Sequence, residues 1–134
     1  MSCTCQDVYE TVAALIGEDH SDSAAEPIKQ RIPALISVCA VEMYELDRAY
    51  RMYVLGKPES ASSADIFPGV SSLSDPLPVC DRLLAPMSFK VAALVVRDEN
   101  PELSEMLMSD CVKSCAAVAE SIPAKVGYTL DVYK

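Results

Sequence analysis

Six cysteines are the residues of this chain that are best suited to chemistry. Cys111 and Cys115 are four residues apart in a pattern of helical period, which places both thiols on one helix face. Cys39 falls on the apolar face of another expected helix. Reduced, structural thiols are the favoured interpretation because a buried free cysteine behaves as a small hydrophobic residue. The alternative is a metal- or redox-active helical bundle, which predicts a bound metal or a thiol of lowered pKa.

The other cysteines do not form a recognisable ligand set. Cys3 and Cys5 are expected in a mobile terminus, and Cys80 precedes an apolar helix. A zinc site that adds the only histidine, His20, is not favoured because the spacing matches none of the usual ligand pairs. His20 itself lies in a polar turn without a paired nucleophile. We therefore expect no metal ligand, no cofactor and no catalytic residue.

Common enzyme motifs are missing from the chain. It contains no G-x-x-x-x-G-K, G-x-G-x-x-G, H-E-x-x-H or G-x-S-x-G, and its four glycines leave little for a phosphate-binding loop. Asp98 and Glu99 are adjacent, which is typical of helix capping and solubility. The sequence thus favours a binding or structural role over an enzyme.

Length and charge limit further what class of protein this chain can be. The 134 residues are expected to form one domain, 1–134, and carry a net charge of −9. Nucleic-acid binding depends on phosphate neutralisation by Lys and Arg, so the chain is a poor DNA binder, although DNA could slide past it. No apolar run approaches the roughly 18 residues of a membrane span, and no basic and apolar leader indicates secretion. Apolar surface beyond one core is expected to face a protein partner.

Residues 81–98 are expected to form a central helix that is buried on most of its circumference. Leu84, Met87 and Val91 recur at the spacing of one helix face, and Phe89 belongs to the other. A helix that is apolar nearly all round must be covered by its neighbours. The remaining elements are therefore expected to wrap around it.

Three further helices are expected, at 5–16, 26–55 and 100–122. The end of the second is uncertain because its last ten residues also alternate like a strand. Asn100 and Pro101 read as the N-cap and first position of the last helix, which a short connection makes antiparallel to the central one. The predicted fold is all-α, a small bundle of about four helices.

Two irregular segments complete the chain. Residues 56–80 form a long loop, rich in proline and serine, whose second half is expected to be pinned to the core by apolar residues. Residues 126–134 alternate like a strand and form an extended C-terminal tail. The tail either lies across the bundle or adds to a sheet edge of another subunit or protein.

Arg48 and Arg51 stand out in so acidic a chain. They mark either a solvated helix face or a contact with an acidic patch of a partner.

Four sequence patterns follow one another between about residues 25 and 120. They are RIPALI at 31–36, LDRAYR at 46–51, the FPG to LSDPLP loop that leads into DRLL at 67–84, and AALVVRDENPELSE at 92–105. In the order and spacing of these patterns the chain resembles the head–tail connector proteins of tailed bacteriophages, the adaptors beneath the portal.

The resemblance implies a virion protein at the head–tail interface, assembled in the host cytoplasm as a closed ring of about twelve copies. Its partners would be the portal protein and a stopper or tail-terminator protein. DNA would pass through the lumen without sequence-specific binding, and no membrane would be involved. The hypothetical portal contacts are Val126, Tyr128, Leu130, Val132 and Tyr133. The hypothetical contacts with a neighbouring subunit or another partner are Arg48, Arg51, Ile66 and Phe67.

A different class of function stays open beside the connector. A small acidic helical module that binds one basic protein, such as a regulator or an antitoxin-like partner, would have the same bundle, with Arg48 and Arg51 incidental.

Overall fold

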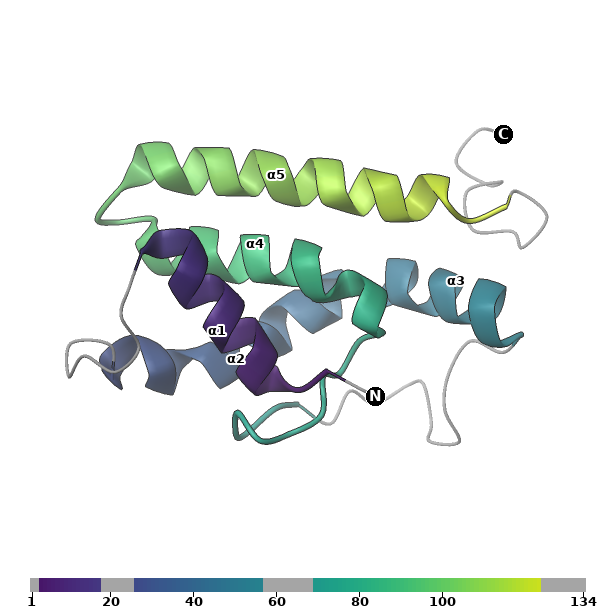
Figure 1. Ribbon diagram of the computed structural model, residues 1–134, viewed down its shortest axis with the longest axis horizontal. Coiled ribbons are helices and arrows are strands. Elements are labelled where there is room, and N and C mark those ends of the chain that lie inside the picture. Colours follow the sequence, from purple (N-terminus) through teal and green to yellow (C-terminus); the bar gives the residue numbers. More distant parts are fainter. Residues whose placement is uncertain (1–2, 18–25, 57–68, 124–134) are drawn as a thin grey trace.

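The protein is an all-α bundle, as the sequence predicts (Figure 1). The computed structural model describes residues 3–17, 26–56 and 69–123. Within these ranges five α-helices follow one another, with a short 3-10 turn, η2, before the fourth. The elements are α1 (Cys5–Ile16), α2 (Glu26–Glu42), α3 (Tyr44–Leu55), η2 (Asp81–Leu83), α4 (Leu84–Val96) and α5 (Pro101–Glu120).

Helix α4 is the centre of the bundle. It lies between α5 on one side and α1 and α2 on the other (Figure 1). Met87, Val91 and Ala92 are fully buried. The predicted burial on most of the circumference is therefore confirmed, but Ala85, which was expected on a covered face, is exposed. The helical segment is shorter than 81–98, since its first turn is the 3-10 turn and its last helical residue is Val96.

Helices α4 and α5 form the predicted antiparallel pair (Figure 1). Asn100 caps α5 by accepting a hydrogen bond from the Leu103 N–H at 3.1 Å, and Pro101 begins the helix. The buried Ser104 hydroxyl donates to the Ala93 carbonyl at 2.8 Å, which ties the two helices together. Helix α5 ends at Glu120, two residues before the predicted end.

The prediction of a single long helix over 26–55 is wrong, because the segment is two helices that meet at Met43. Its φ of −94° and ψ of 7° leave the helical region and turn the axis. Helical hydrogen bonds nevertheless continue across this residue. The Met43 N–H donates to the Cys39 carbonyl, and the Met43 carbonyl accepts from the Asp47 N–H, both at 2.9 Å. The break lets α2 pack on α4 and α3 pack on α5, which one straight helix does not reach.

The expectation of a mobile terminus at Cys3 and Cys5 is also wrong. Thr4 forms an antiparallel bridge with Pro76. The Cys5 N–H donates to the Asp75 carbonyl at 3.0 Å, and Cys5 is fully buried at the start of α1. Backbone pairing with the distant loop holds this segment in place.

The second half of the loop 56–80 is pinned, as predicted. The Val70 N–H donates to the Ser37 hydroxyl at 2.9 Å, and Leu77 and Val79 are buried. The first half of the loop, with Ile66 and Phe67, and the tail 126–134 lie outside the described residues.

Candidate functional site

The two arginines of α3 have different surroundings. Arg51 donates through Nε to both carboxylate oxygens of Asp47, at 3.1 and 3.0 Å. Asp47 is 8% exposed and also accepts from the Cys80 N–H at 2.7 Å. Arg51 therefore supports a carboxylate that anchors the end of the loop to α3. Arg48 is exposed, and no ion pair joins it within the part of the chain that is described.

Replacing Asp47 with alanine is expected to lower the free energy of unfolding by about 1–3 kcal/mol, because the Cys80 N–H loses its acceptor in a poorly hydrated place. Asp47→Asn keeps an acceptor oxygen and is expected to lose less. Urea unfolding followed by circular dichroism measures both. Equal losses would assign the effect to the Arg51 ion pair instead of the Cys80 bond.

Three helices bring three thiols around one ammonium group. Lys90 of α4 forms an ion pair with Glu42 of α2. Its charge acts on Cys39 of α2 and on Cys111 and Cys115 of α5. The sequence placed these cysteines on inner helix faces but did not reveal the lysine among them.

The thiols differ in acidity. Burial raises the pKa of Cys39 to about 12. The neighbouring Cys111 and Cys115 thiols act on each other, which raises the pKa of Cys111 and lowers that of Cys115 to about 7, with help from the Lys90 charge. Cys3, Cys5 and Cys80 have raised pKa values, chiefly through burial. Cys115 is thus the one cysteine of the chain with a lowered pKa, and it is partly exposed.

Cys115 is expected to be the first cysteine that iodoacetamide alkylates at pH 7, since the thiolate is the nucleophile. Its rate should rise as the pH passes through about 7, where the thiol deprotonates, instead of near the ordinary 9.0. Cys111→Ala removes the neighbouring thiol that lowers the Cys115 pKa and should shift this profile to higher pH. Peptide mass spectrometry of timed samples measures the rates. Uniform labelling of the six cysteines would contradict the assignment.

The described residues contain no group of three or more His, Cys, Asp or Glu side chains that could hold a metal ion. His20 lies outside the described ranges. The described part of the cysteine cluster therefore offers no metal-ligand set. Its chemical feature is the lowered pKa of the Cys115 thiol.

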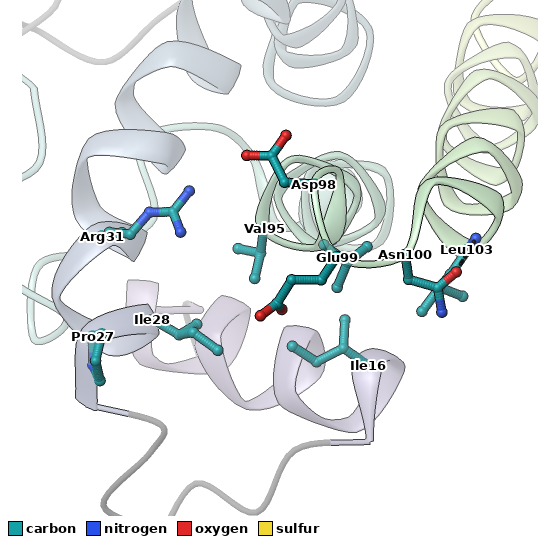
Figure 2. Close-up of a pocket in the computed structure, with 10 residues that line it drawn as sticks. Ile16, Pro27, Ile28, Arg31, Val95, Asp98, Glu99, Asn100 and Leu103 are labelled. Atoms are coloured by element: carbon teal, nitrogen blue, oxygen red, sulfur yellow. Dashed lines mark hydrogen bonds between the residues drawn. The ribbon is translucent and has the colours of Figure 1, made fainter.

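A pocket of about 690 Å³ opens where the C-terminal end of α1, the N-terminal part of α2 and the α4–α5 turn meet (Figure 2). Figure 2 shows the Glu99 side chain extending between Ile28 and Ile16, with Arg31 on the α2 wall. Asp98 also lines the pocket. Its described lining includes no His, Cys or Ser, so it offers a surface for binding without a nucleophile–base pair.

Large apolar side chains are exposed on three helices. Met52, Tyr53 and Val54 belong to α3, and the others belong to α2 and α5, which lie on either side of α4. Val38 and Val41 of α2 are 52% and 59% exposed, and Met106 and Val112 of α5 are each 64% exposed. Helix α4 lies between α2 and α5 (Figure 1). Because the buried residues of α2 and α5 face the core, we infer that these exposed side chains point away from α4 toward opposite sides.

No known protein family, curated protein or solved structure matches this chain. Within the described residues no helix has both the length and the apolar character that crossing a membrane requires. The hypothetical portal contacts Val126, Tyr128, Leu130, Val132 and Tyr133 lie outside these residues, as do Ile66 and Phe67.

Sequence reasoning missed Asp47, Lys90 and Arg31. Each is a single charged residue within an expected helix, and its role depends on a partner from another element. The spacing of Asp47 and Arg51, four residues apart, was the one local signal available.

Proposed function

We propose that this chain is a structural virion protein, a head–tail connector of a tailed bacteriophage that forms a ring beneath the portal. The motifs at 31–36, 46–51, 67–84 and 92–105 support the proposal through their resemblance to this family. The proposed ring joins the capsid to the tail, and DNA passes through its lumen.

The observation that carries the proposal is the exposure of Val38 and Val41 on one face of the bundle and of Met106 and Val112 on the opposite face. A subunit of a closed ring contacts its two neighbours through two different surfaces. Exposed apolar patches of monomeric proteins commonly mark interaction sites. The exposed apolar side chains of α2 and α5 fit a subunit with a neighbour on each side.

The charge of the chain fits the proposed channel. A net charge of −9 repels the phosphates of DNA and gives a lumen to which the genome does not adhere. The partly exposed thiols and the pocket at the α4–α5 turn are not needed for this role.

Native mass spectrometry of the purified chain, alone and mixed with the portal protein of the genome that encodes it, tests the proposal. We expect a monomer that becomes a ring of many copies on the portal. Negative-stain images of the mixture should show the ring on the portal axis.

A chain that ignores the portal would contradict the connector. Capture of one basic protein at equal stoichiometry would then favour the acidic binding module.

A further inference from the structure

The exposed side of α2 carries a graded stripe, which we call the α2 stripe. It begins with a positive charge, continues with small and apolar side chains, and ends with a negative charge. Its exposed residues are Arg31, Ala34, Val38, Val41 and Glu42. The Glu42 side chain is 50% exposed although it pairs with Lys90, so its carboxylate stays accessible from outside.

The exposed side of α5 carries a stripe with the opposite order of charge, the α5 stripe. It begins with negative charges, continues with apolar and small side chains, and reaches a positive charge. Its exposed residues are Glu102, Glu105, Met106, Ser109, Val112 and Lys113. Residues at these intervals lie along one side of a helix.

The two stripes have the same length. Arg31 and Glu42 are eleven residues apart, and so are Glu102 and Lys113. At 1.5 Å per residue each interval spans about 16 Å. When the two helices are placed side by side in the same direction, Arg31 meets Glu102, Val41 meets Val112 and Glu42 meets Lys113. In the opposite direction Arg31 would meet Lys113, a contact between like charges.

We propose that the α2 stripe of one copy packs, in parallel, against the α5 stripe of the next copy, with Arg31 opposite Glu102. This inference rests on the proposed ring, because it names the surfaces that join its neighbours. The charges at both ends are complementary, and Val41 meets Val112, between two faces that point away from each other in one copy. They can therefore meet only between copies, and the contact propagates from subunit to subunit until a ring closes.

Charge reversal tests the contact. Arg31→Glu and Glu102→Arg each place like charges across the interface, and each is expected to raise the concentration for half-maximal ring assembly on the portal about tenfold. The double variant restores opposite charges in swapped order and should assemble like the wild-type chain. Glu120→Arg makes the same charge change on the same helix, beyond the stripe, and is the matched control. Native mass spectrometry counts the copies, and thermal unfolding confirms that each variant is folded.

The outcomes separate this inference from the proposed function. Weakened single variants with a restored double variant support the contact. A wild-type ring with unaffected single variants, or a double variant as weak as the singles, overturns the contact and leaves the connector standing. If Glu102→Arg weakened ring assembly and Arg31→Glu did not, the contact between copies would be overturned, and the α5 stripe would be assigned to the portal instead. A wild-type chain that forms no ring on the portal overturns both.

Discussion

Met87→Ala is expected to lower the free energy of unfolding by about 2–5 kcal/mol. Met87 is fully buried on α4, the helix that α1, α2 and α5 cover. Truncation removes its transfer free energy and leaves a cavity that the rigid surrounding helices fill only in part. A loss of this size is a large share of the net stability of a small domain. Urea unfolding followed by circular dichroism, with the slope checked for constancy, measures it.

Met106→Ala is the matched control, because it removes the same atoms from a side chain that is 64% exposed on α5. Surface substitutions of this kind change stability by about 0.5 kcal/mol or less. Equal losses in the two variants would show that α4 is not the buried centre of the fold.

Val41→Asp and Met106→Asp are each expected to abolish ring assembly while leaving the subunit folded. Both side chains are more than half exposed in the single chain, at 59% and 64%, so the new carboxylates stay hydrated there. In the proposed ring each would be buried without a partner, which costs several kcal/mol. Since about 1.4 kcal/mol is a tenfold change in an equilibrium constant, assembly should weaken by about 100-fold or more.

An equimolar mixture of these two variants distinguishes a ring contact from a symmetric dimer. In a ring the intact α5 stripe of Val41→Asp can bind the intact α2 stripe of Met106→Asp, so the mixture should form 1:1 pairs that stop growing. Analytical ultracentrifugation without the portal detects them, at a protein concentration raised until wild-type chains begin to associate with one another. A mixture that stays monomeric would contradict the two-faced contact.

The sequence predicted the candidate site only where its residues lie close together on one helix. The helical spacing of Cys111 and Cys115 predicts two thiols on one face, and both do lie in the cluster beside Lys90. The lowered pKa of Cys115 depends on the neighbouring Cys111 thiol and on the charge of Lys90, and the position of Lys90 depends on how α4 and α5 pack. Arg51 was predicted as a possible partner contact, yet it pairs with Asp47, whose other bond reaches Cys80.

The all-α class, the buried central helix and the cap of the last helix all follow from local sequence. These depend on apolar period and on residues next to each other, such as Asn100 and Pro101, whose physical effect does not need distant partners. Tertiary packing decided the rest. No proline or glycine lies at Met43 to predict the turn there. The turn exists because α2 packs on α4 whereas α3 packs on α5. The order of Cys3 and Cys5 comes from backbone bonds to residues 75–77, and the opposition of the α2 and α5 faces comes from α4 between them.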